Sequence, residues 1–325
     1  MEHDLIALGE TMLALAPPAG ESLRTAATLA IDHAGAESNT CVGLARLGFR
    51  VAWVSRLGAD VSGDRILAGI RDEGVDVQWV ERDAQRPTGL MLKDPGSGVQ
   101  YYRRDSAASV MTPSLLDPVP VADARAVLVT GVTALISETA HAAGLALLER
   151  SPGLRIVDPN LRSGLWGSSR RAELVLAFAA RCDLLLAGAD ELAEILGAEG
   201  AGGTEKAGGA GELRGAGQAG LAGEAGGTNA AEQLARRAAA LGPREIVVRG
   251  AGTVGVLADG SWSEIDIRRG AAVDPIGAGD AFNAGYIAVR LRGGGVSDAL
   301  HAGTRCGAAV TTAVSDTSAF PRQLE

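Results

Sequence analysis

Short apolar strands alternate with amphipathic helices along most of this 325-residue chain, and this alternation constrains the fold more than any other feature. Residues 5–10 and 51–58 are predicted as buried strands. A helix with Ser38 as its N-cap is predicted between them, and the helix predicted over 64–73 ends at Gly74. The same order of strand and helix returns from residue 126 onward and ends with a helix predicted from Ser297 to about Val314. Strands that alternate with helices form parallel sheets covered on both faces. The sequence therefore predicts a three-layer α/β/α domain.

The alternation breaks between residues 87 and 104, where a strand, an Asp-Pro-Gly turn and a second strand predict a hairpin. A lone hairpin is marginally stable and must pair with other strands. The irregular segment 11–34 can supply them, so we expect 11–34 and 87–104 to form a small β-sheet that acts as a lid. An ordinary surface hairpin is the alternative.

The main domain then comprises residues 1–10, 35–86 and 105–325. Within it, residues 197–228 are almost all Gly and Ala with a few charges. Such a tract buries too little apolar surface to offset its ordering entropy, which predicts a mobile surface insertion.

The composition, 46% hydrophobic and 21% charged, allows a sizeable core. The formal net charge of −9 argues against nucleic acid or a membrane surface as a partner. The four His have no ligand spacing, so no transition-metal site is expected. With no basic leader and no long apolar span, a soluble cytoplasmic protein is expected. Buried free thiols in a reducing compartment are expected at three widely spaced cysteines: Cys41, Cys182 and Cys306.

The stretch DPIGAGDAFNAG, residues 274–285, is the strongest functional motif. A turn of small residues, Gly277, Ala278 and Gly279, leads into a helix with apolar periodicity. Unpaired backbone N–H groups at such a helix start suit an anion, because the helix dipole adds to them. Asp280 would repel a phosphate there, but it could accept the proton of a hydroxyl that attacks a phosphoryl group. A plain N-cap is the alternative role for this aspartate.

Two other phosphate-binding motifs are excluded, one because it is absent and one because its surroundings do not fit. No GxxxxGK[ST] sequence occurs, which excludes a Walker A kinase. The GxGxxG pattern at 215–220 lies in the Gly/Ala tract, and the one at 250–255 lies between two predicted strands. A dinucleotide-binding turn needs a helix after the strand, so a nicotinamide-dependent dehydrogenase is rejected.

Two segments offer cations to a ligand. Tyr101 and Arg103 share one face of a predicted strand and could present a ring and a bidentate guanidinium to a carboxylate. Arg162 follows a strand at the carboxyl edge of the sheet, where α/β folds bind ligands. A charged edge strand and a loop-capping arginine are the corresponding structural alternatives.

Together, AGAESN, PTGL, YYRRDSAAS, DPNLRSGLW and DPIGAGD resemble the ribokinase-like (PfkB) carbohydrate kinases, in particular the 2-keto-3-deoxygluconate kinase branch. The resemblance covers nearly the whole chain apart from the Gly/Ala tract. It implies a ribokinase-like fold, ATP and Mg²⁺ as cofactors, and phosphorylation of 2-dehydro-3-deoxy-D-gluconate on its 6-hydroxyl. It also implies that Asp280 is the catalytic base and that the amides of Gly277, Ala278 and Gly279 form an anion hole.

The resemblance further implies two groups of binding residues. Those expected to hold the sugar acid are Gly35, Asn39, Tyr101, Arg103, Arg162 and Asp316. Those expected on the ATP side are Asn160, Glu191, Arg249, Gly250, Ala251 and Gly252.

The sequence departs from the family pattern at three places. Ala34 replaces the first glycine of a usual Gly-Gly pair, Met91 replaces an aromatic residue after PTGL, and Gly188 replaces the asparagine of the N-x-x-E motif. These changes leave two alternatives open: another sugar kinase of the family, such as a fructokinase, or a catalytically weak sugar-acid sensor. Exposed lid strands also predict a homodimer.

Overall fold

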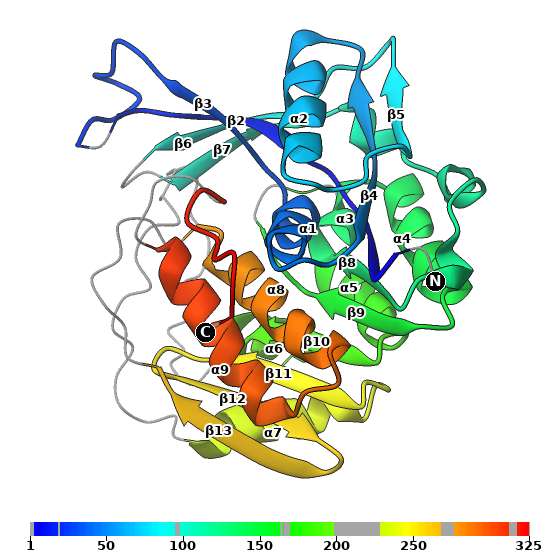
Figure 1. Cartoon of the computed structure of the whole chain (residues 1–325), viewed down its shortest axis with the longest axis vertical. Helices are drawn as coiled ribbons and strands as arrows, with labels where there is room; N and C mark the ends of the chain where they lie inside the picture. The colour runs from blue at the N-terminus through cyan, green and yellow to red at the C-terminus, as the bar shows by residue number, and fades with distance from the viewer. Residues whose placement is uncertain are drawn as a thin grey trace.

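The structure, a computed structural model, describes residues 3–18, 20–94, 98–162, 165, 170–197, 228–267, 276–311 and 317–324. Within these ranges the chain forms a nine-stranded sheet and a separate four-stranded sheet (Figure 1). The strands of the large sheet are β1 (Leu5–Leu8), β4 (Val51–Gly58), β5 (Val80–Asp83), β8 (Ala126–Thr130), β9 (Leu154–Asp158), β10 (Leu184–Gly188), β11 (Glu245–Arg249), β12 (Thr253–Ala258) and β13 (Ser261–Asp266).

The large sheet has the order β13-β12-β11-β10-β9-β8-β1-β4-β5. Its pairs are parallel from β5 to β11, and the pairs β11–β12 and β12–β13 are antiparallel. Parallel strands place their carboxyl ends along one edge of a sheet, where ligands bind in α/β folds. This edge therefore collects the residues that follow β1, β8, β9, β10 and β11.

Helices cover both faces of this sheet. They are α1 (Ala36–Arg46), α2 (Val61–Asp72), α3 (Gly131–Ile136), α4 (Glu138–Arg150), α5 (Arg171–Ala179), α6 (Ala189–Ile195), α7 (Thr228–Ala239), α8 (Ala278–Leu291) and α9 (Val296–Val310). Successive strand residues point to opposite faces. Ile6 and Leu8 accordingly pack with α3 to α7, whereas Leu5 and Ala7 pack with α1, α2, α8 and α9. The three-layer α/β architecture predicted from the sequence is confirmed.

The second sheet consists of β2 (Met12–Ala16), β3 (Ala30–Ala34), β6 (Leu90–Asp94) and β7 (Gly98–Tyr102), in the order β3-β2-β6-β7. All four strands lie within the two segments from which a small sheet was expected. The hairpin β6–β7 joins the N-terminal segment through parallel pairing of β2 with β6. Because β2 directly follows β1, the small sheet projects from the carboxyl edge of the large one (Figure 1).

Helices α1 and α8 approach each other unusually closely. A Cβ atom built on Gly43 of α1 would lie 2.6 Å from the Cβ of Ala284 on α8 and 3.2 Å from the ring of Phe320. Real Cβ atoms do not come so near, so the contact requires glycine. The two helices thereby bring their first turns together at the carboxyl edge of the sheet.

Several local predictions need correction. Ser38 is not the N-cap of α1, because the helix begins at Ala36 and Gly35 occupies the cap position. The Ser38 hydroxyl instead donates to the Gly35 carbonyl and accepts from Thr11. The short helix α3 and the edge strands β5 and β13 were not predicted. Residues 198–227 of the Gly/Ala tract, the turn at 95–97 and the end of the predicted last helix lie outside the described residues.

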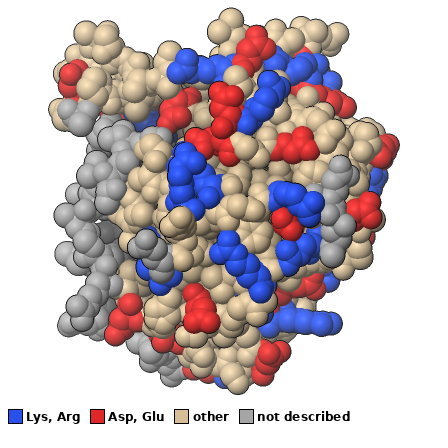
Figure 2. All heavy atoms as spheres, viewed as in Figure 1, with Lys and Arg blue, Asp and Glu red and all other residues tan. Residues whose placement is uncertain are grey.

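Basic and acidic side chains alternate over the face shown in Figure 2, without an extended patch of one sign. In the part of the chain that the structure describes, no helix is both long and apolar enough to span a membrane. The three cysteines are buried and unpaired, as predicted, and burial raises the pKa of the Cys306 thiol to about 11.

Candidate active site

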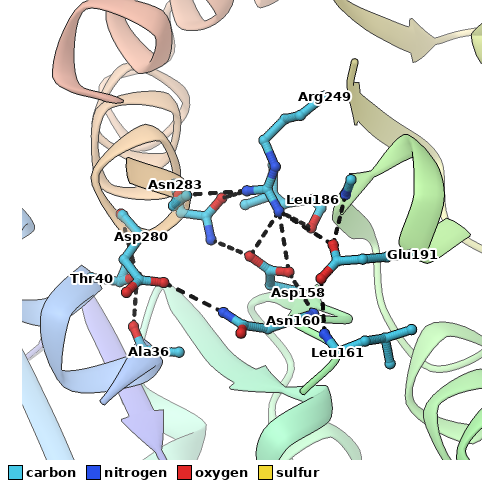
Figure 3. Close-up of polar contacts among 12 residues, drawn as sticks. Ala36, Thr40, Asp158, Asn160, Leu161, Leu186, Glu191, Arg249, Asp280 and Asn283 are labelled. Carbon is cyan, nitrogen blue, oxygen red and sulfur yellow. Dashed lines mark hydrogen bonds and ion pairs between the residues drawn. The ribbon is translucent and has the colours of Figure 1, made fainter. Parts of the chain in front are cut away.

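Asp280 lies in the first turn of α8 and is 6% exposed. The amide of Asn39, on α1, donates through Nδ2 to Asp280 Oδ2 at 2.8 Å. Asn160, just after β9, donates through Nδ2 to Asp280 Oδ1 at a longer 3.5 Å (Figure 3). The Thr40 hydroxyl lies 3.5 Å from the Asp280 carbonyl. The carboxylate is therefore held in one orientation by donors from two other elements.

The helix start before Asp280 has the backbone of an anion site. Gly277 occupies the N-cap of α8 in the left-handed region, with φ +84°, where glycine is favoured. The first-turn amides of Ala278, Gly279 and Asp280 have no acceptor within the helix. At Gly279 an added Cβ would point toward the Arg249 guanidinium, 3.7 Å away. Small residues thus keep this helix end open and close to a cation.

One cavity lies between Asp280 and the small sheet. Its lining includes the predicted residues Gly35, Asn39, Tyr101, Arg103, Asn160, Arg162, Gly277 and Asp280, together with Glu10, Met91 and Lys93, which were not predicted to bind ligand. Asp316, the remaining predicted sugar residue, lies outside the described residues. The structure therefore brings the other predicted sugar-side residues together around the proposed base.

A buried ion pair fixes Arg103 in this cavity. Its Nη2 donates to Oε2 of Glu10, and both side chains are less than one-tenth exposed. Ser106 donates its hydroxyl to the other Glu10 oxygen at 2.7 Å. The guanidinium carbon lies 5.7 Å from the centre of the Tyr101 ring. Glu10 was missed in the sequence, although an acid just after the first buried strand, at the ligand-binding edge, was a usable signal.

Beyond Asp280, Arg249 at the end of β11 is the centre of a second polar cluster (Figure 3). It donates through Nη2 to Asp158 Oδ2 at 3.1 Å and through Nη1 to Asn283 Oδ1 at 2.7 Å. Asn283 also donates to Asp158 at 2.6 Å. Burial alone would lower the pKa of Arg249, but the carboxylates of Asp158 and Glu191 more than offset it and raise that pKa.

Glu191, the retained acid of the altered motif, is committed to backbone amides. Its two oxygens accept from the N–H groups of Gly188 and Leu161, each at 2.8 Å, and one lies 3.9 Å from Arg249. Burial and the nearby Asp158 charge raise the pKa of Glu191, while Arg249 opposes that rise. The glutamate thus caps α6 through the Gly188 N–H and holds the loop after β9, and neither contact uses a side chain at residue 188.

The predicted ATP-side turn joins β11 to β12. Gly250 donates its N–H to the Thr253 carbonyl at 2.8 Å, and Ile267 donates to the Gly252 carbonyl at 2.7 Å. Ala251 and Gly252 are exposed. The turn therefore offers open backbone to a ligand beside Arg249. Among the described residues, no group of three or more His, Cys, Asp or Glu side chains could hold a metal ion.

Comparison with known proteins decides the family. The sequence pattern of the pfkB family carbohydrate kinases matches residues 2–323. The chain belongs to the PfkB family of carbohydrate kinases.

The curated proteins that resemble this chain include two kinases named for 2-dehydro-3-deoxy sugar acids. The 2-dehydro-3-deoxygalactonokinase of Haloferax volcanii is 30% identical, with 97% of this chain and 93% of its own length aligned. The 2-dehydro-3-deoxygluconokinase of Bacillus subtilis is also 30% identical, with 99% of this chain and 93% of its own length aligned. The crystal structure of Vibrio cholerae fructokinase bound to fructose, ADP and calcium superposes with a TM-score of 0.80 at 20% identity, covering 99% of this chain and 97% of that one. The predicted ribokinase-like fold is confirmed.

For a PfkB-family kinase, the arrangement divides into two sides of Asp280. Apart from Asp316, which lies outside the described residues, the residues predicted for the sugar line the cavity beneath the small sheet. Of the residues predicted for ATP, Glu191 belongs to α6, Arg249 ends β11, and residues 250–252 form the turn between β11 and β12. Asn160 is the exception, because its side chain lies in the cavity against Asp280.

Proposed function

We propose that this kinase transfers the γ-phosphoryl group of ATP to the 6-hydroxyl of 2-dehydro-3-deoxy-D-gluconate. The observation that carries the proposal is the presence of Arg103 and Arg162 in the same cavity as Asp280. Guanidinium groups bind carboxylates through paired, charge-assisted hydrogen bonds. A sugar acid can therefore bind with its carboxylate at the arginines and its terminal hydroxyl at Asp280. The names of the Haloferax volcanii and Bacillus subtilis relatives support the same substrate class.

In the proposed reaction Asp280 acts as general base. It accepts the proton of the terminal hydroxyl while the hydroxyl oxygen forms a bond to the γ-phosphorus. The bond from that phosphorus to the β–γ bridging oxygen breaks, and ADP leaves. Amides at Gly277, Ala278 and Gly279 stabilise the charge on the transferred group. Hydrogen bonds from Asn39 and Asn160 hold the carboxylate in the orientation that this step needs.

The residues on the other side of Asp280 fit a nucleotide with its metal. The open start of α8 suits phosphate oxygens, and the exposed turn at 250–252 can lie against the nucleotide. Mg²⁺ usually binds through substrate phosphates, waters and at most two carboxylates, of which Asp158 and Glu191 are the candidates here. Bound Mg²⁺ would neutralise phosphate charge.

We assign the small sheet the role of a lid. Its inner residues Met91, Lys93 and Tyr101 face the cavity, so closure over bound sugar would exclude water and limit ATP hydrolysis. Its outer surface carries exposed Ile31 and Tyr102, at 48% and 56% exposure, which supports a homodimer formed through the lid. Light scattering in solution tests the dimer.

Two alternatives are separated by one experiment, ADP release measured over a panel of sugars. The 2-dehydro-3-deoxy acids of the gluconate and galactonate series should be phosphorylated far faster than fructose or ribose. Preference for fructose would favour a neutral-sugar kinase. No ADP release with any sugar would favour a sugar-acid sensor, an idea that rests on Gly188 in place of the usual asparagine.

A further inference from the structure

Two buried carbonyl oxygens beside Asp280 have no hydrogen-bond partner. They are Oδ1 of Asn39 and Oδ1 of Asn160, on residues that are 2% and 6% exposed. Buried polar atoms in folded proteins are nearly always paired. Both residues line the cavity under the small sheet. An acceptor buried there without a partner points to a donor that arrives with the ligand.

The orientation of each amide follows from chemistry. An amide carbonyl facing a carboxylate would be repelled, whereas the NH₂ group is attracted, so each Nδ2 must face Asp280. Each Oδ1 is then directed away from Asp280. Asn39 belongs to the predicted sugar-side residues, but Asn160 was expected on the ATP side.

The backbone of Asn160 holds its side chain in this position. The backbone of Asn160 has a φ of +36°, in the left-handed region, which residues other than glycine adopt at an energetic penalty. Its N–H donates to Asp158 Oδ1 at 2.9 Å, and Asp158 in turn is paired with Arg249. Such conformations persist at functional sites because the surroundings enforce them. The carboxylate network therefore directs the Asn160 side chain toward Asp280 (Figure 3).

We infer that Asn160 serves the sugar and the base, not the nucleotide. Its Nδ2 positions Asp280, and its Oδ1 accepts a hydrogen bond from the substrate hydroxyl next to the one that is phosphorylated. The substrate class is then a polyol with two neighbouring hydroxyls at its reacting end. This inference rests on the proposed role of Asp280 as base, but not on which sugar is used.

The first test is Asn160→Gly, which keeps the left-handed backbone and removes both side-chain contacts. Loss of a buried hydrogen-bond partner predicts roughly a tenfold rise in KM for the sugar. Loss of the aiming contact predicts a further fall in kcat. The Kd of Mg·ADP, measured by calorimetry without sugar, should stay within about twofold. The matched control is Asp259→Gly in the exposed β12–β13 turn, where φ is +50°. In this control the sugar KM, the kcat and the Kd of Mg·ADP should all stay unchanged.

A second variant separates positioning from a merely structural role. Asn160→Asp keeps the shape but adds a carboxylate beside Asp280, and like charges raise a carboxyl pKa. The acid limb of the kcat/KM profile should therefore move to higher pH. Weaker Mg·ADP binding with an unchanged sugar KM, or an unmoved pH profile in Asn160→Asp, would overturn the inference.

Failure of the proposed function can be distinguished from failure of the assignment of Asn160. If wild-type enzyme prefers another sugar, the same constants are measured on that sugar. If it phosphorylates none, calorimetric Kd values for 2-dehydro-3-deoxy-D-gluconate and Mg·ADP carry the test. Asn160→Gly must then weaken only the sugar acid; equal weakening of both, or of neither, contradicts the assignment.

Discussion

The groups that a ligand would meet differ between the two sides of Asp280: they are side chains on one side and backbone groups on the other. On the proposed sugar side the cavity is lined by side chains, and its buried cation Arg103 is already paired with Glu10. On the proposed nucleotide side the open groups are backbone amides of the α8 start and the exposed backbone of residues 251 and 252. The arginine there, Arg249, is engaged with Asp158 and Asn283.

This difference suggests where specificity can change. Side chains arranged by buried charge pairs define one ligand shape, and single substitutions can alter it. Backbone amides recognise phosphate whatever the side chains are. Substitutions on the sugar side should therefore change sugar kinetics while nucleotide affinity stays nearly constant, and the following predictions test that separation.

The largest effect is expected at the boundary between the two sides. Asp280→Asn removes the base but keeps the size and polarity of the side chain. General-base contributions of about 10²–10⁴-fold predict a corresponding fall in kcat. The Kd values of Mg·ADP and of the sugar acid, measured by calorimetry, should change little. Turnover near the wild-type rate would remove Asp280 from the mechanism.

The next largest effect is expected for the ion pair of the sugar side. Glu10→Gln leaves the buried Arg103 charge without its counter-ion, which should lower the free energy of unfolding by about 3 kcal/mol. Urea denaturation measures this, and Mg·ADP affinity should be unchanged. Glu232→Gln, which breaks an exposed pair with Arg236, is the matched control and should change stability little. Equal stabilities of the two variants would show that the buried pair does not organise the cavity.

Arg162→Ala tests the charge of the ligand. Loss of a charge-assisted hydrogen bond should raise KM roughly ten- to hundredfold for the sugar acid. Activity on neutral sugars, however low, should be unaffected because they carry no carboxylate. Arg170→Ala, at an exposed arginine paired with Glu173, serves as the control. A similar loss for acid and neutral sugars would argue against carboxylate recognition.

The smallest effect is expected for a buried carboxyl in the first turn of α1, on the proposed sugar side. Glu37 is fully buried, and burial raises its carboxyl pKa above the ordinary 4.5. The folded chain then retains a proton that the unfolded chain releases above that pH. Its contribution to stability is present below 4.5 and is lost as pH rises through the folded-state pKa.

Glu37→Gln stays neutral and should escape this loss. Relative to wild type its free energy of unfolding should rise between pH 5 and pH 8. Urea denaturation at the two pH values checks the difference. The KM for the sugar and the Kd of Mg·ADP should not change. A difference that is constant with pH would mean that Glu37 does not titrate on unfolding.

Much of the fold was predictable because parallel strands buried on both faces leave continuous apolar runs, as at residues 51–58 and 184–188. Edge strands do not: β5 is VERD and β13 is SWSEID, and their polar sequences give no buried-strand signal. Ser38 misled because serine is a good N-cap, whereas the helix starts earlier, at an extended glycine.

The candidate site was predictable only where a motif lies within one short stretch. Asp280 and its glycines are contiguous, so their sequence identifies them. The contact of Asn160 with Asp280 spans 120 residues, and that of Arg103 with Glu10 spans 93. No local pattern records such pairings, since they depend on how the strands are ordered in the sheet. Glu10 was therefore missed, and Asn160 was expected on the other side of the base.

Gly43 is an unexpected weak point of the proposed catalytic geometry. Its missing side chain sets the spacing of α1 and α8, and these two helices carry the donor Asn39 and the acceptor Asp280. A single methyl group there, chemically inert and one helical turn from the reaction, would force the helices apart. Because displacements near 1 Å can slow an enzyme about a hundredfold, an apolar substitution in the packing could mimic an active-site lesion.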